Sequence, residues 1–177
     1  VLGIIITEVY GSGRAKLVLW STLGCELFFA IIVYALLLLP APKYWQHDAD
    51  YHFVFGPIIH FVLSGVISVL ISNTVSIYML SRLKYLLTGK FFCLRMIFAS
   101  AIGGLTMVML IVLLVYMPLV GFDKSIVLAK SIYIIELIYT LVLSVPAWLI
   151  ANILKNAEGI NIIEKNIKFN PFIINLT

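Results

Sequence analysis

Apolar side chains dominate four long stretches of the chain, and each stretch is interrupted at only a few polar positions. A helix needs roughly 20 residues to cross about 30 Å of hydrocarbon, and each stretch reaches that length. Proline removes one backbone donor and crowds the preceding turn, so Pro146 is expected to bend the last stretch unless that helix tilts. The predicted spans are Leu17–Leu39, Ile58–Leu80, Ile97–Val120 and Ile126–Leu154.

The segment Val1–Tyr10 is also apolar but is too short to span a membrane. We expect it to be the second half of a further helix whose start lies before this sequence. The pattern therefore predicts an all-α fold, a multi-pass transmembrane helix bundle with four full helices and one partial helix. Residues 1–177 would form a single integral membrane domain.

The composition supports a membrane protein. Hydrophobic residues make up 63% of the chain and charged residues 11%, whereas a soluble domain is usually about half apolar and about a quarter charged. The net charge of +4 does not indicate nucleic-acid binding, because the basic residues flank the apolar stretches, where they set topology. No phosphate-binding loop, metal motif or Ser–His–acid set is apparent. We therefore expect neither an enzyme nor a cofactor or metal site, and not a complete ATP-driven pump.

Basic residues alternate between the predicted connections. They occur in Gly11–Lys16 and in Ser81–Arg95, and by the positive-inside rule these connections and the tail 155–177 face the cytoplasm. The basic residues assigned to that face are Arg14, Arg82, Lys84, Lys90 and Arg95.

The connection Pro40–Gly56 would lie outside. It is rich in aromatic residues, and it fits either an aromatic belt at the membrane interface or a lid over a substrate. Its aromatic residues are Tyr44, Trp45, Tyr51 and Phe53.

Three ionisable residues, Glu26, His60 and Glu136, lie inside the predicted spans. A charge at bilayer depth costs about 2.5–3.5 kcal/mol on insertion scales. Such a group must find a partner, take up a proton or face water. All three are candidates for a solute path. For Glu26 and Glu136 the alternative is a structural hydrogen bond to a neighbouring helix, and for His60 it is a ring that reaches the membrane interface.

The second span adds an amide and a row of hydroxyls. Asn73 offers donors and acceptors suited to the edge of a heterocycle. The serines Ser64, Ser68, Ser72 and Ser76 recur every four residues, which is typical of a close-packing seam between helices.

The third span carries two overlapping pairs of small residues, Ala99/Gly103 and Ser100/Gly104. We expect these pairs to form a second seam, although their glycines could also let a flat ligand approach the backbone.

Several motifs together resemble the queuosine precursor transporter family, also called the vitamin-uptake-like or VUT family. They are TEVYG at Thr7–Gly11 followed by Arg14, LSRLKYLLTGKFFCLR at Leu80–Arg95, AEGINI at Ala157–Ile162 and KFNPF at Lys168–Phe172. The resemblance implies a bacterial inner-membrane protein of six helices, of which about five are visible here. It implies a fold similar to the substrate-binding subunits of energy-coupling-factor vitamin transporters, and import of a deazaguanine precursor of the tRNA base queuosine.

The resemblance also implies site residues. Glu8 matches the acid of TEVYG, and Arg95 matches the arginine that opens the following helix. Asn73 stands where the family is expected to have glutamine, Ser76 where it is expected to have asparagine, and His60 where arginine is expected. The predicted substrate-binding residues are Glu8, Glu26, His60, Asn73, Ser76 and Glu136.

Five positions depart from the family pattern. Ile4, Gly104 and Met107 replace an expected aspartate, glutamine and aspartate. Glu136 replaces a lysine, and Glu26 replaces a neutral polar residue. Such changes alter specificity more readily than fold.

The leading hypothesis is an inner-membrane importer of 7-cyano-7-deazaguanine, 7-aminomethyl-7-deazaguanine, queuine or a related planar heterocycle. A second hypothesis is a substrate-binding subunit that needs energising subunits. A third is a membrane scaffold without transport activity. The expected partners are the lipid bilayer and a nucleobase-like small molecule, with a homodimer or energising subunits as further possibilities.

Overall fold

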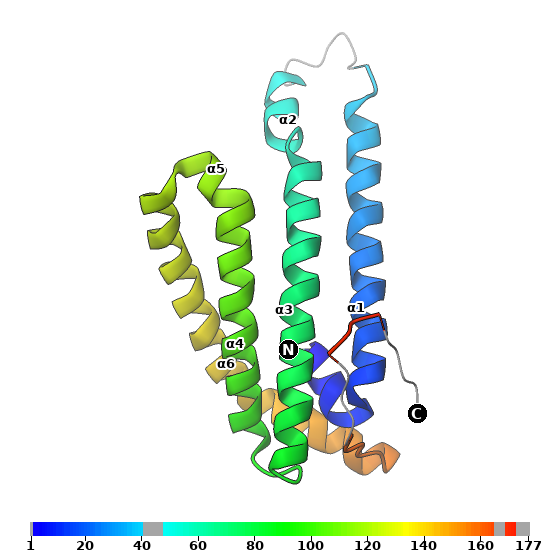
Figure 1. The fold of residues 1–177 in the computed structure, drawn as a ribbon. Coiled ribbons are helices and arrows are strands. Elements are labelled where there is room, and N and C mark those ends of the chain that lie inside the picture. Colours follow the sequence, from blue (N-terminus) through cyan, green and yellow to red (C-terminus); the bar gives the residue numbers. More distant parts are fainter. Residues whose placement is uncertain (1, 41–47, 165–168, 173–177) are drawn as a thin grey trace.

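The computed structural model describes residues 2–40, 48–164 and 169–172, and every regular element in these ranges is helical. The predicted all-α class is therefore confirmed (Figure 1). The elements are α1 (Leu2–Leu37), α2 (Asp48–Phe55), α3 (Ile58–Leu86), α4 (Phe92–Ile111), the π-helix η1 (Val112–Tyr116), α5 (Met117–Val120) and α6 (Phe122–Glu158).

Among the described residues, four helical stretches are long and apolar enough to cross a membrane, which confirms the number of predicted spans. A helix suits such a sequence because it satisfies every backbone polar group internally, and hydrocarbon offers no other partner. The four stretches are Leu2–Leu37, Ala49–Leu86, Phe92–Val120 and Phe122–Glu158.

The predicted spans were too short, because the helices continue through polar residues that sequence patterns assign to loops. The expected connection at 81–95 shrinks to 87–91, and that at 121–125 shrinks to Gly121 alone. Gly121 has φ 82° and ψ 167°, a conformation that glycine adopts without the steric penalty of a Cβ. The aromatic connection contains helix α2, while Tyr44 and Trp45 lie outside the described residues.

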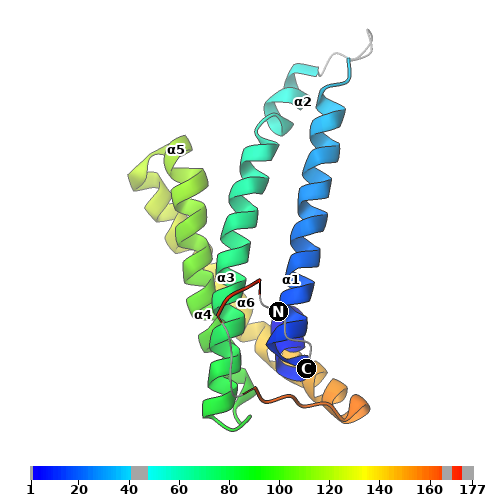
Figure 2. The same cartoon turned by 45° about the vertical axis from the view of Figure 1, so that its right-hand side comes forward.

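A sharp kink at Gly11 divides α1 into two parts, with φ 85° and ψ 174° at this residue. The first part, residues 2–10, lies folded back against the start of the long second part (Figure 2). The predicted break between a short apolar segment and the first full span is thus confirmed. The expected connection Gly11–Lys16 is wrong, since α1 is helical again directly after Gly11.

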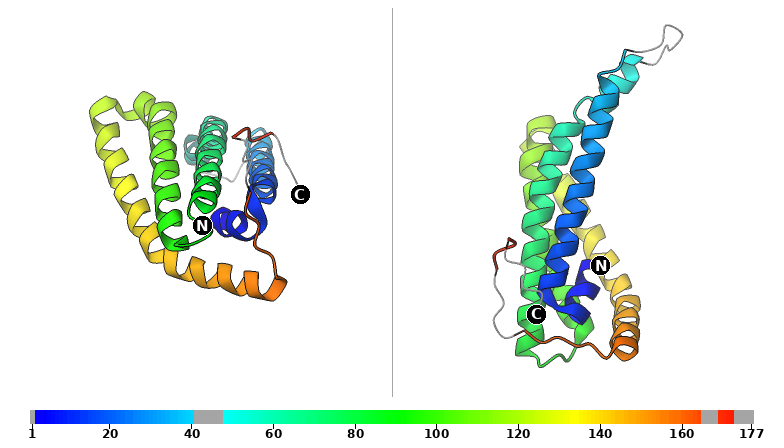
Figure 3. Two further views of the ribbon diagram at one scale, coloured as in Figure 1. Left: turned by 60° about the horizontal axis from the view of Figure 1, so that its bottom comes forward. Right: turned by 90° about the vertical axis from the view of Figure 1, so that its right-hand side faces the viewer.

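The long helices pack in the order α1, α3, α4 and α6. Figure 3 shows that α6 bends between its yellow and orange parts, and that the orange end crosses towards the first part of α1. Pro146 lies inside α6, and its missing N–H explains a bend in this region. A buried apolar cluster lies where these elements meet, formed by Ile5, Val9, Phe92, Met96, Ala147 and Ala151.

Gly103 on α4 makes the close contact with α3 that the small-residue pattern predicted. A Cβ placed on Gly103 would lie 3.1 Å from the Ser72 carbonyl oxygen and would overlap the Ser76 hydroxyl. The two backbones therefore approach as they do in other small-residue seams.

The described parts of the C-terminal segment lie against α1. The Ile162 N–H donates to the Val9 carbonyl at 3.4 Å, and the Ser12 N–H donates to Glu164 Oε1 at 2.8 Å. Further along, Lys16 Nζ donates to the Asn170 carbonyl at 2.8 Å. The motifs AEGINI and TEVYG are thereby brought together, while Lys168 of KFNPF lies outside the described residues.

Candidate functional site

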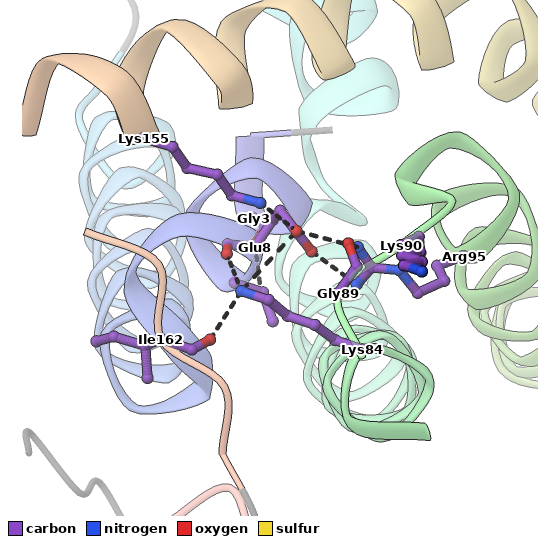
Figure 4. Close-up of polar contacts among 9 residues, drawn as sticks. Gly3, Glu8, Lys84, Gly89, Lys90, Arg95, Lys155 and Ile162 are labelled. Carbon is purple, nitrogen blue, oxygen red and sulfur yellow. Dashed lines mark hydrogen bonds and ion pairs between the residues drawn. The ribbon is translucent and has the colours of Figure 1, made fainter. Parts of the chain in front are cut away.

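One buried carboxylate joins four helices at the end of the bundle where α3 and α4 connect. Glu8, from the first part of α1, is 0% exposed and accepts two hydrogen bonds from Arg95 of α4, at 2.9 and 3.1 Å. Lys155 of α6 donates to Glu8 Oε1 at 2.6 Å, and Lys84 Nζ of α3 lies 3.8 Å from the same oxygen. Figure 4 shows the four side chains converging, and we call this group the charged junction.

Backbone carbonyls accept further hydrogen bonds from two of these cations. Lys84 Nζ donates to the Glu8 carbonyl and, at 2.7 Å, to the Ile162 carbonyl. Arg95 Nε donates to the Lys90 carbonyl at 2.8 Å, and its Nη2 donates to the Gly89 carbonyl at 3.0 Å. The charged junction thus fastens the α3–α4 connection and the C-terminal segment as well as the helices.

Such a network makes Glu8 a structural residue by its contacts. Removing one partner of a buried ion pair lowers the stability of the fold by about 3–5 kcal/mol, because the other charge is left uncompensated. The predicted role of Glu8 in substrate binding stays a prediction. Five basic residues were predicted for the cytoplasmic face. Lys84 and Arg95 are buried in the charged junction, whereas Arg14, Arg82 and Lys90 are exposed.

The two carboxylates inside the spans have a different environment. Glu26 on α1 is half-buried, and its Oε1 lies 3.3 Å from a Cβ placed on Gly65 of α3. Glu136 on α6 is also half-buried, and its carboxylate lies over Gly104 of α4. Within the described ranges neither carboxylate has a hydrogen-bond or ion-pair partner.

The polar residues of α3 divide between a seam and an exposed face. Ser76 is half-buried, with its hydroxyl against Gly103. Asn73 is exposed on α3, so its amide is accessible to a solute or another chain. Ser76 therefore has a packing role in this structure, and the Asn73 amide has no hydrogen-bond partner among the described residues.

The His60 side chain on α3 contacts the backbone of the π-helix η1. Its Nε2 lies 3.2 Å from the Leu114 carbonyl in η1. Pro118 follows Leu114 by four residues and has no N–H with which to form the usual helical bond. The His60 ring N–H can donate to this carbonyl, to which Pro118 cannot donate, and the contact joins α3 to the π-helical segment.

No hydrogen bond or ion pair joins any two of the six predicted substrate residues within the described parts of the chain. Sequence reasoning missed Lys155 as a partner of Glu8, and it missed Gly104 as the space that admits Glu136. The motifs did carry a signal for the first, since Glu8 lies within TEVYG and Lys155 shortly precedes AEGINI, but they gave none for the pairing itself.

Taken together, the long apolar helices, the internal ion-pair network and the carboxylates within the spans define a polytopic α-helical membrane protein. Residues 1–151 match the family model described as "Putative vitamin uptake transporter". The chain belongs to this family, which makes it a membrane protein of the small-molecule transporter class. Searches of curated proteins and of solved structures give no match.

Proposed function

We propose that this protein imports a queuosine precursor, or a related planar heterocycle, across the bacterial inner membrane. The proposal rests on two carboxylates, those of Glu26 and Glu136. Each lies inside an apolar helix, and neither has a partner among the described residues. An unpaired charge at such depth is unfavourable by about 2.5–3.5 kcal/mol, so its retention fits a role toward a solute. Membership of the transporter family supports the same role.

The chemistry of the ligand matches these groups. The edge of a deazaguanine carries ring N–H and amino donors, which are well suited to carboxylate acceptors. Glu26 and Glu136 would accept these donors, and the exposed amide of Asn73 would supply both a donor and an acceptor. His60 would line the outer entrance, next to η1. Ser76 would keep the α3–α4 seam close behind the site.

The proposal also fixes an orientation. The exposed residues Arg14, Arg82 and Lys90 lie at the end that holds the charged junction, and the positive-inside rule assigns such an end to the cytoplasm. The tail 155–177 would then be cytoplasmic. In this proposal Glu8 holds the cytoplasmic ends of the helices together, and ligand contact is left to the residues within the spans.

The test is uptake of labelled precursor by cells that lack their own synthesis and uptake genes. Cells that express the full protein should accumulate label and regain queuosine in tRNA, whereas cells with the double variant E26Q/E136Q at equal membrane level should do neither. If the well-expressed wild-type protein neither accumulates label nor restores queuosine, the substrate assignment is wrong. Uptake that appears only when ATP-binding subunits are co-expressed would instead identify a substrate-binding subunit.

A further inference from the structure

Gly104 determines where the Glu136 carboxylate lies. A Cβ placed on Gly104 would lie 2.6 Å from Glu136 Cδ and 2.7 Å from its Oε2, which is far inside van der Waals contact. Every residue other than glycine would therefore displace the carboxylate from this position. Gly104 is buried, so the carboxylate lies in the contact between α4 and α6 and not on the outer surface of α6.

Neighbouring contacts fix this face of α6. The Tyr133 hydroxyl, one turn before Glu136, donates to the Ala101 carbonyl of α4 at 3.2 Å. Two turns after Glu136, the Ser144 carbonyl lies 3.6 Å from Cys93 Sγ of α4. Glu136 thus lies between two points at which α6 contacts α4, which places its side chain against α4.

No cation among the described residues pairs with Glu136. Lys84, Arg95 and Lys155 are engaged with Glu8 at the charged junction. A ligand that reaches this carboxylate is therefore favoured if it brings a cation of its own, because the opposite charge compensates a carboxylate that has no counter-charge among the described residues.

Building on the proposed function, we propose that the Glu136–Gly104 pair makes this transporter selective for planar heterocycles that carry a cationic amine. The carboxylate of Glu136 accepts an N–H from the protonated amine, and Gly104 leaves room for that carboxylate between α4 and α6. The matched probes are 7-aminomethyl-7-deazaguanine, whose amine is protonated at neutral pH, and 7-cyano-7-deazaguanine, which has a neutral nitrile at the same position. The two bases share the ring that the rest of the site would contact.

The experiment measures the affinity of the full chain in lipid nanodiscs for both bases at pH 7. The wild-type protein should bind the aminomethyl base at least about tenfold more tightly than the cyano base. E136Q should bring the two affinities within about twofold of each other, because the glutamine keeps the size of the side chain and removes its charge. E136D keeps the charge and should retain a preference for the amine.

E26Q is the matched control, since it removes the other carboxylate within the spans. It should weaken both bases by a similar factor and leave their ratio near the wild-type value. Equal wild-type affinities, or a ratio that E136Q leaves unchanged, would overturn the selectivity while the proposed function stands. Binding of neither base would contradict the proposed function, and this inference with it. Thermal unfolding of each variant establishes that the folded protein is compared.

Discussion

The charged junction and the carboxylates within the spans show two ways in which a helical membrane protein accommodates acidic groups. At the charged junction, Glu8 is fully buried and is met by three cations from three other helices. Within the spans, Glu26 and Glu136 each lie beside a glycine and have no partner among the described residues. The difference indicates that burial alone does not identify a functional acid. A paired acid holds helices together, while an unpaired acid is available to a solute.

The largest effect is expected at the charged junction, and it tests whether this junction stabilises the fold. E8Q should lower the free energy of unfolding by about 3–5 kcal/mol, because Arg95, Lys84 and Lys155 lose their shared counter-charge. Unfolding of the purified protein in detergent measures this change.

The matched control is E158Q. The Glu158 carboxylate accepts a hydrogen bond from the Tyr10 hydroxyl at 2.6 Å, but at an exposed site. Its loss should change stability by less than about 0.5 kcal/mol. An E8Q protein that unfolds like the wild type would show that the charged junction does not hold the fold.

A smaller effect is expected where small residues, and not charges, join two helices. G103A should destabilise the protein by about 1–3 kcal/mol, because the new Cβ overpacks against Ser72 and Ser76. Its control is G24A, since a Cβ on Gly24 meets no atom within 4 Å, and alanine favours a helix over glycine by about 0.5–1 kcal/mol. Thermal unfolding should therefore move in opposite directions for the two variants. Equal shifts would refute close packing at Gly103.

The smallest effect concerns His60. Replacing it by alanine should cost about 0.5–1.5 kcal/mol, the usual net value of one hydrogen bond, because the Leu114 carbonyl loses its ring donor. P118A restores a backbone N–H near that carbonyl, so H60A should cost less in the P118A background. A double-mutant cycle with no coupling energy would contradict the link between His60 and Pro118.

The sequence predicted those features that depend on local pattern. Apolar length gave the four spans, and the break near Gly11 followed from a short apolar segment that precedes polar residues. The small-residue pairs predicted a close contact of α4, and Gly103 makes it. Helix ends were less predictable, because Arg95 and Lys84 are polar in sequence yet buried and helical in the fold.

The features that depend on distant residues were not predictable. The partners of Glu8 lie 76, 87 and 147 positions away along the chain, and no local pattern predicts their convergence. The same holds for Glu136, whose position depends on the absence of a side chain at Gly104 on another helix. Their position inside apolar stretches identified Glu26, His60 and Glu136 as unusual, but only the packing separates His60, which contacts Leu114, from the two carboxylates, which have no partner among the described residues.

The most direct test of the central claim is uptake of labelled precursor per folded molecule by the E26Q/E136Q double variant. Our account predicts that this protein unfolds at or above the wild-type temperature, because removing unpaired charges from the spans relieves a cost of about 2.5–3.5 kcal/mol per group on insertion scales. It also predicts that uptake falls at least about tenfold, equivalent to about 1.4 kcal/mol. Wild-type uptake by the double variant would contradict the assignment of these carboxylates to the solute.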